Sequence, residues 1–139
     1  MRTEIYERLP EGAKLVREKV FMEEQGHEND FDETDARASH VVIYDGEGRP
    51  VAACRAFEGE RPGEYQLGRV AVLKEYRGRG LGAMVIRAAE EHVRKKGGGS
   101  VSLCALCSAA GFYKKLGYDE YGEIDGSGLR PHIWMRKTL

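Results

Sequence analysis

A glycine-rich segment, Arg77-Gly78-Arg79-Gly80-Leu81-Gly82, is the part of the sequence best suited to holding an anion. It precedes an amphipathic stretch that has no Ser, Thr, Asp or Asn to cap its start, so the first backbone N–H groups need an outside acceptor. Glycines let a phosphate approach that backbone closely, and a helix dipole with two nearby arginines favours negative charge. The segment is neither a Walker A loop nor G-x-G-x-x-G, because its glycines alternate and no Gly-Lys-Ser/Thr follows. We expect a phosphate-binding loop; the alternative is a flexible turn with exposed arginines.

Three cysteines, Cys54, Cys104 and Cys107, raise the question of metal or redox chemistry. A structural zinc site takes about four ligands, and Cys104-x-x-Cys107 has no second pair to complete one. A thioredoxin-type motif follows a strand, begins a helix and lies in an electropositive setting. We therefore expect free thiols in a reducing cytoplasm and no metal site.

An acidic segment between Glu23 and Asp35 contains seven carboxylates and no lysine or arginine. Its simplest interpretation is a solvated loop. The alternative is a lip that attracts a cationic substrate through its charge.

Strands and helices alternate around these segments. In chain order, we expect a helix over 11–21, strands over 40–44, 51–57 and 65–73, a helix over 81–96, a strand over 101–105, a short helix capped by Ser108, and a strand over about 132–136. The helix over 81–96 has the clearest apolar stripe, formed by Leu81, Met84, Val85, Ala88, Ala89, His92 and Val93. The order predicts an α/β fold in one domain over 1–139, with a mixed central sheet flanked by helices.

Composition narrows the class of protein. The 139 residues are 41% hydrophobic and 32% charged, as is usual for soluble globular proteins. The 22 basic and 23 acidic residues give a net charge of −1, which argues against a nucleic-acid binder. No apolar run approaches the ~18 residues that span a bilayer, and the N-terminus has no signal-peptide pattern. We expect a cytoplasmic protein with no nucleic-acid or membrane partner.

Two blocks resemble motifs of the GNAT superfamily of N-acetyltransferases. Val70-Ala71-Val72 followed by the glycine-rich segment looks like its acetyl-CoA signature, Gln/Arg-x-x-Gly-x-Gly/Ala, and the block 109–118 resembles its later motif, Phe-Tyr-Glu-Lys-Leu-Gly-Phe. The blocks 20–25 and 131–135 resemble a subgroup that includes ElaA-like and YjcF-like proteins and glyphosate N-acetyltransferase. The resemblance covers nearly the whole chain. It implies the GNAT, or acyl-CoA N-acyltransferase, fold and transfer of acetyl from acetyl-CoA to an amine, with no metal.

The resemblance also implies a cofactor site. Its residues are Val70, Ala71, Val72, Arg77, Gly78, Arg79, Gly80, Leu81, Gly82 and Phe112. The loop amides would hold the CoA pyrophosphate, and the strand before the loop would pair its backbone with pantetheine. An exposed N–H on that strand can also stabilise the oxyanion that forms during acetyl transfer.

By the same resemblance, Tyr113 is the general acid that gives a proton or hydrogen bond to the leaving thiolate. It lies one residue past Phe112, about 100° from the stripe that Phe112 and Leu116 define as a core pair. The alternative is a tyrosine packed at the edge of a helix.

The candidate base is His132, which matches the base histidine of the glyphosate-acetylating relatives. It opens the last expected strand and shares a face with Trp134. The alternative is a half-buried histidine bonded to the backbone. His40 and Glu24 are the next candidates; His92 fits a structural role and His27 a solvated one.

Arg69 and Glu24 are the expected acceptor-binding residues. Arg69 matches an arginine that contacts substrate in the subgroup, and it can bind a carboxylate or phosphate; the alternative is a surface strand residue. Cys104 and Leu106 depart from the subgroup, standing where many relatives have Asn and where the glyphosate enzymes have a substrate-binding Arg.

Three classes of function fit these observations. They are an acetyltransferase for small amines, a protein lysine or N-terminal acetyltransferase, and a non-catalytic CoA-binding domain. Tyr113 and His132 together favour an enzyme. The acceptor's identity and the oligomeric state, monomer or homodimer, stay open.

Overall fold

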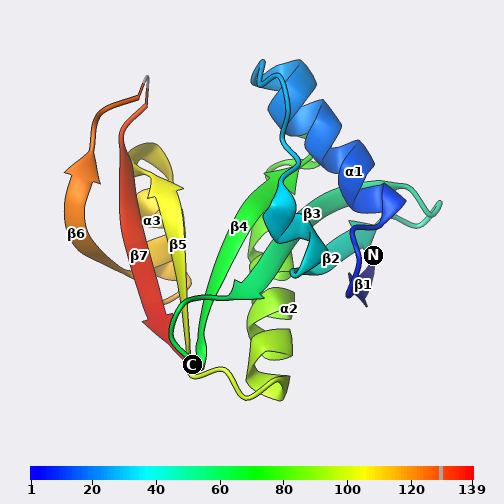
Figure 1. Ribbon diagram of the computed structural model, residues 1–139. Helices are drawn as coiled ribbons and strands as arrows, with labels where there is room; N and C mark the ends of the chain where they lie inside the picture. Colours follow the sequence, from blue (N-terminus) through cyan, green and yellow to red (C-terminus); the bar gives the residue numbers. More distant parts are fainter. Residues whose placement is uncertain (129) are drawn as a thin grey trace.

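Residues 1–128 and 130–139, which the computed structural model describes, form a seven-stranded sheet with helices on both faces (Figure 1). The strands are β1 (Arg2–Tyr6), β2 (Ser39–Tyr44), β3 (Pro50–Glu58), β4 (Glu64–Val72), β5 (Ser100–Leu106), β6 (Asp119–Asp125) and β7 (His132–Thr138). The helices are α1 (Glu11–Arg17), its π-helical continuation η1 (Glu18–Glu24), α2 (Leu81–Lys95) and α3 (Ala110–Lys115), with short 3₁₀ turns η2 (Glu33–Ala36), η3 (Lys74–Tyr76) and η4 (Cys107–Ala109). The predicted mixed α/β fold is confirmed.

The order of strands in the sheet is β1-β2-β3-β4-β5-β7-β6, and only β4 and β5 are parallel neighbours. The two outermost strands, β1 and β6, were not predicted from the sequence. Both are largely exposed, so neither needs the alternating apolar face by which a strand is recognised.

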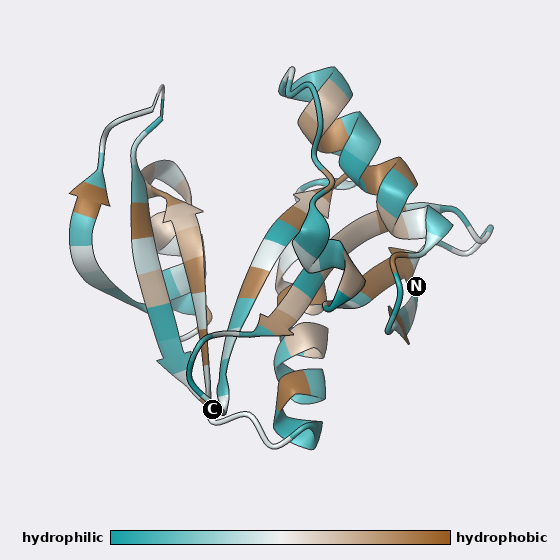
Figure 2. Cartoon of the chain, in the orientation of Figure 1, coloured by the Kyte–Doolittle hydropathy of each residue, from teal (hydrophilic) through white to brown (hydrophobic). Residues whose placement is uncertain are grey.

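Helices α1 and α2 cover opposite faces of β3. The thiol of Cys54 lies 3.6 Å from the carbonyl oxygen of Val85 in α2, while the next side chain, Arg55, points to the α1 side. Figure 2 shows hydrophilic and hydrophobic residues alternating along both helices, as expected where one side of a helix packs on a sheet. The core therefore lies in two layers, one on each face of the central strands.

The expected stripe of α2 is correct at Leu81 and Val85 and wrong at two other positions. Met84, in the expected stripe, is exposed, whereas Glu90, outside it, is only 2% exposed. The Tyr118 hydroxyl donates to Glu90 at 2.7 Å, and the Lys137 ammonium donates to it at 2.9 Å. The reason is that α2 also packs against the chain after α3, which supplies partners for a buried carboxylate.

The parallel strands β4 and β5 separate along their length (Figure 1). They pair only where Glu64–Gln66 lies against Ser100–Ser102. Beyond these residues each strand keeps its outer neighbour, β3 or β7, so the two facing edges carry backbone groups available to another molecule. This opening is the feature of the fold around which the candidate site is built.

A β-bulge interrupts β4 beside the opening. Ala53 opposes Ala71 and Arg55 opposes Gly68, so one residue of β3 faces two residues of β4, Arg69 and Val70. The alternation of side chains along the expected strand over 65–73 is therefore broken at Arg69.

Candidate active site

A cavity of about 730 Å³ occupies the opening between β4 and β5. Its wall is formed by η1 and the segment after it, by 67–70 of β4, by 103–106 of β5, by Tyr113 of α3 and by His132 of β7. The structure thus brings together four residues predicted from the sequence, namely Arg69, Val70, Tyr113 and His132. The volume lies within the range of small-molecule sites, roughly 300–1,000 Å³.

Tyr113 reaches the cavity from α3 with its ring buried to 9% exposure. Burial raises the pKa of its hydroxyl to about 12, so the phenol stays protonated near neutral pH. Among the described residues, the Tyr113 hydroxyl has no hydrogen-bond partner. The only fully buried side-chain N or O atom without a partner there is Arg55 Nε. The oxygen of Tyr113 is therefore a free donor at the wall of the cavity.

The expected core pair of Phe112 and Leu116 is wrong at Phe112, which is 40% exposed. Leu116 packs, half-buried, against the core, and Ala110 and Tyr113 face the core more fully. The inward face of α3 is rotated because Tyr113 packs edge-to-face on Tyr118, with ring centres 5.9 Å apart. Nor does Ser108 cap this helix, which starts at Ala110 after a 3₁₀ turn.

His132 opens β7 and faces the cavity from the opposite side of the opening to β4. Its Nδ1 lies 2.9 Å from the carbonyl oxygen of Arg130. Because a carbonyl can only accept, Nδ1 carries the proton, and Nε2 of the neutral ring is left with its lone pair. The ring is thereby held in the tautomer that a proton-accepting Nε2 requires.

The glycine-rich loop has the geometry of an open anion site. Gly80 is the N-cap of α2 with φ of 80°, and Gly78 has φ of 79°, conformations that favour glycine. The first hydrogen bond of the helix joins Met84 N–H to Gly80 C=O at 3.1 Å, so the amides before Met84 have no acceptor within the helix. A Cβ atom at Gly78 or Gly80 would meet nothing within 4 Å. Both glycines therefore border open space at the start of α2.

Gly82 and Phe112 meet at the start of α2. A Cβ atom on Gly82 would lie 3.2 Å from the Phe112 ring, so glycine lets α3 come close to the loop. Phe112, a predicted cofactor residue, is thus placed between the loop and the cavity-lining Tyr113, whose ring lies 5.0 Å from its own.

The two arginines of the loop differ in their partners. Arg77 makes a bidentate ion pair with Glu24, in which both hydrogen bonds are 2.7 Å long. Its Nε donates to Val72 C=O at 3.0 Å. The hydrogen bonds from Arg77 hold the pKa of Glu24 below its usual value. Arg79 instead stacks on the Tyr76 ring at 4.9 Å. Glu24, expected to bind the acceptor, therefore lies on Arg77 and joins η1 to the loop, away from the cavity wall.

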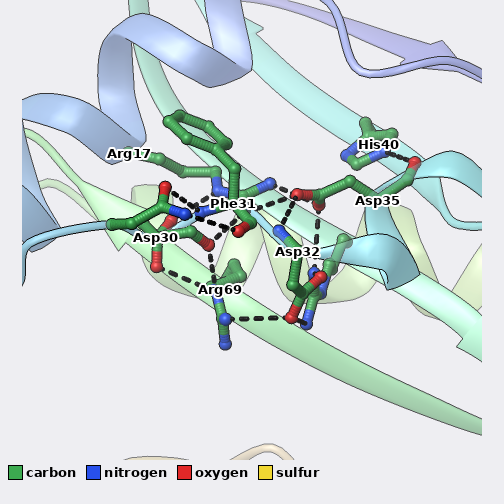
Figure 3. A network of polar contacts seen from close by, with 9 residues as sticks. Arg17, Asp30, Phe31, Asp32, Asp35, His40 and Arg69 are labelled. Carbon is green, nitrogen blue, oxygen red and sulfur yellow. Dashed lines mark hydrogen bonds and ion pairs between the residues drawn. The ribbon is translucent and has the colours of Figure 1, made fainter.

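The part of the acidic segment that contains its aspartates is not a solvated loop. We call residues 29–36 the strap; Figure 3 shows how its aspartates meet arginines from the rest of the fold. Arg17 of α1 contacts Asp30 at 2.6 Å and Asp35 at 2.7 Å, and both carboxylates are almost fully buried. Sequence spacing did not reveal this, because the partner arginines lie far away in the chain.

The same strap binds two strands of the sheet. Arg55 of β3 donates to Asp32 at 2.6 Å and to Asp35 at 3.0 Å, and Arg69 of β4 contacts Asp30 at 2.8 Å and Asp32 at 3.2 Å. Burial alone would raise the pKa of Asp35, but hydrogen bonds led by Arg17 lower it to about 2. The three aspartates and the three arginines sum to zero charge, so this network offers no net charge to attract a cation.

The other histidines lie in different settings. His40 is buried, its Nε2 donates to the carbonyl oxygen of Asp35 at 3.0 Å, and burial lowers its pKa. His92 is half-buried, with Nε2 3.0 Å from Ser39 Oγ. His27, expected to be solvated, is exposed but lies at the cavity wall. Only His27 and His132 thus reach the cavity within the described part of the chain.

The cysteines are free thiols, as predicted. Cys54 is sealed in the core, where burial raises its pKa to about 12. Cys104 lies at the cavity wall, and burial raises its pKa too. Within residues 1–128 and 130–139, no group of three His, Cys, Asp or Glu side chains is arranged to hold a metal ion. Across the same residues, no helix is both long and apolar enough to cross a bilayer.

Several wall residues were not found from the sequence. Phe21 belongs to η1, Gln25 follows directly after it, and Asn29 belongs to the strap. The bond from Gln25 N–H to Val20 C=O spans five residues and widens the helix there, a π-helical feature common at functional sites. The subgroup resemblance of 20–25 was the only sequence signal at this wall.

Comparisons with known proteins agree with this geometry. The model of the acetyltransferase (GNAT) family matches residues 4–118. The uncharacterized N-acetyltransferase YjcF of Bacillus subtilis is 37% identical over 129 residues, covering 90% of this chain and 89% of YjcF. The crystal structure of Escherichia coli ElaA has a TM-score of 0.86 at 22% identity and covers 98% of each chain. An aminoglycoside 6'-N-acetyltransferase complexed with coenzyme A has a TM-score of 0.77 at 18% identity, covering 99% of this chain and 97% of that one. At these low identities the two structural likenesses concern the fold alone.

Proposed function

The chain belongs to the acetyltransferase (GNAT) family, and from that premise we propose that it acetylates the primary amine of a small molecule. The family makes it an acetyl-CoA-dependent acyltransferase. The observation that carries the finer proposal is that Tyr113 and His132 line one cavity at the opening between β4 and β5. A cavity of about 730 Å³ suits a small acceptor together with the acetylated end of the cofactor.

The residues present fit acetyl-CoA, whose thioester supplies the acetyl group. The amides of 78–82 would hold its pyrophosphate, because they are unpaired at a helix start and Gly78 and Gly80 have open space beside them. The edge of β4 at Val70–Val72 would pair with the pantetheine arm, since β5 does not occupy it. Phe112, beside Gly82, would pack along the arm. Arg79 would add positive charge, while Arg77 shapes the loop through Glu24.

Tyr113 would act as the general acid. Its hydroxyl is the free donor of the cavity wall, and a pKa of about 12 keeps its proton in place until sulfur leaves as a thiolate. A bound proton donor in a water-poor wall stabilises the leaving sulfur without reorganisation of solvent.

His132 would accept the amine's proton through Nε2. An alkylamine with a pKa near ~10 is mostly protonated at neutral pH, so it needs a proton acceptor before it can attack the thioester. The Nδ1 bond to Arg130 presets the required tautomer. His40 is less suited to this role, because it is buried against Asp35 away from the cavity.

The test is a thiol-release assay with acetyl-CoA and a panel of amines, amino acids, aminosugars, polyamines and peptides, followed by a pH–rate profile with the best acceptor. Activity should rise with pH as the proton acceptor becomes neutral, because only its neutral form can take the amine's proton. His132→Ala should lose that step and about 10²-fold in rate. His92→Ala, which changes a histidine outside the cavity, is the matched control and should keep the step.

Two outcomes would contradict the proposal. If peptides are acetylated far better than any small amine, the acceptor class is wrong. If His132→Ala keeps both the acidic limb and most of its rate, the proton leaves by another route and His132 is structural.

A further inference from the structure

Arg69 has a backbone conformation that its side chain does not favour. Its φ of 50° lies in the left-handed region, and it is the one non-glycine residue with positive φ in the described part of the chain. An arginine resists this conformation because its Cβ crowds the following carbonyl oxygen, a penalty that glycine escapes. Something in the surrounding structure must hold Arg69 there.

Hydrogen bonds and ion pairs with the strap hold Arg69 in this conformation. Arg69 Nε lies 3.1 Å from the carbonyl oxygen and 2.8 Å from Oδ1 of Asp30, and Nη2 donates to Asp32 Oδ2 at 3.2 Å (Figure 3). The strap cannot easily move with the arginine, because Arg17 and Arg55 bind its carboxylates from α1 and β3. The guanidinium of Arg69 is therefore held by a strap that is itself bound to α1 and β3.

The fixed residue forms the β-bulge at the edge of the cavity. Arg69 and Val70 together oppose one residue of β3, and Val70 begins the edge proposed to pair with pantetheine. A change in the Arg69 backbone would turn the peptide that joins it to Val70, and hence the groups offered to the acetyl thioester. The strap can in this way control the reacting edge of β4 through Arg69.

We propose that Arg69 is a positioning residue, held by the strap so that the β4 bulge presents its backbone to the acetyl thioester. This replaces the sequence-based expectation that Arg69 binds an anion on the acceptor. Two aspartates already neutralise its charge, and binding an acceptor carboxylate would place a third anion beside them. The inference rests on the proposed function for the identity of the bound thioester, but not for the conformation itself.

The test compares Arg69→Gly with Arg69→Ala. Both remove the guanidinium, but only glycine takes up a φ of 50° without strain. We expect Arg69→Ala to lower kcat about 10-fold through a displaced edge. Arg69→Gly should recover most of that loss, while the KM for the acceptor changes little in either variant. Equal loss in both variants, expressed mainly in the acceptor KM, would show that the guanidinium contacts the acceptor.

A double-mutant cycle tests the part played by the strap. Asp32 is partly exposed, so Asp32→Asn should fold. It should lower kcat several-fold in the wild-type background and have no further effect on kcat in Arg69→Gly, because Asp32 then has no residue-69 guanidinium to hold and its remaining partner, Arg55, does not lie on β4. An undiminished Asp32→Asn effect in the glycine background would mean that the strap acts on another part of the site.

An NMR measurement separates this inference from the proposed reaction. The amide shifts of Val70 and Ala71 should stay near their wild-type values in Arg69→Gly and move in Arg69→Ala, whether or not a substrate has been found. Equal movement in the two variants would overturn the inference. A failure of the amine panel, with the amide shifts as expected, would instead count against the proposed function alone.

Discussion

The strap network and the glycine-rich loop both involve arginines, but they differ in how many hydrogen-bond donors are left unpaired. In the strap network each arginine meets aspartates, and the charges cancel. At the loop, the amides of 78–83 have no backbone acceptor and the guanidinium of Arg79 has no ion-pair partner among the described residues. Paired donors hold the fold in place, whereas unpaired donors at an open surface are available to bind. The position of an arginine in the sequence does not tell these roles apart.

Blocking the unpaired amides of the glycine-rich loop should have the largest effect, a loss of acetyl-CoA binding. Gly80→Glu puts a negative side chain where the phosphates would lie, so acetyl-CoA affinity should fall at least about 10³-fold by calorimetry. The control is Gly48→Glu, because Gly48 has a similar φ of 82° and also has free space around it, in the β2–β3 turn. Comparable binding by the two variants would remove the loop from the cofactor site.

Two tyrosines show the same difference between an unpaired and a paired donor. Tyr113 has a free hydroxyl, while the Tyr118 hydroxyl is bonded to Glu90 at 2.7 Å. Tyr113→Phe should lower kcat by about 10²-fold with acetyl-CoA affinity little changed. Tyr118→Phe should mainly lower the free energy of unfolding, by about 1 kcal/mol. Turnover and urea unfolding measured on both variants check this, and an unchanged kcat for Tyr113→Phe would give that residue a packing role.

The ion pairs of the strap should make the free energy of unfolding depend on pH in the acid range. The folded-state pKa of Asp35 is about 2, below the ordinary 3.8, so its ion pairs stabilise the fold above pH 4 and are lost as pH falls toward 2. The shift corresponds to about 2 kcal/mol. Asp35→Asn should remove this part of the acid dependence in urea unfolding from pH 5 to 2, and it should destabilise the protein at pH 7. Asp119→Asn, on an exposed edge strand, is the control with the same change of charge. Matching curves for Asp35→Asn and wild type would show that the network adds no stability.

The parts predicted best from sequence are those set by local pattern. The helix over 81–96 and the glycine loop carry their signals within a few residues, and Tyr113 and His132 lie in blocks that resemble known motifs. The strap could not be predicted, because Arg17, Arg55 and Arg69 are 13 to 39 residues from their partners. The bulge at Arg69 also escaped detection, since an arginine gives no sign of a positive φ.

Amide hydrogen exchange on the wild-type protein, followed by NMR with and without acetyl-CoA, tests the division between paired and unpaired donors most directly. The account predicts that binding protects the amides of the glycine-rich loop and of the β4 edge at Val70–Val72, while exchange in the strap stays unchanged. Protection that appears in the strap and is missing from the loop would contradict it.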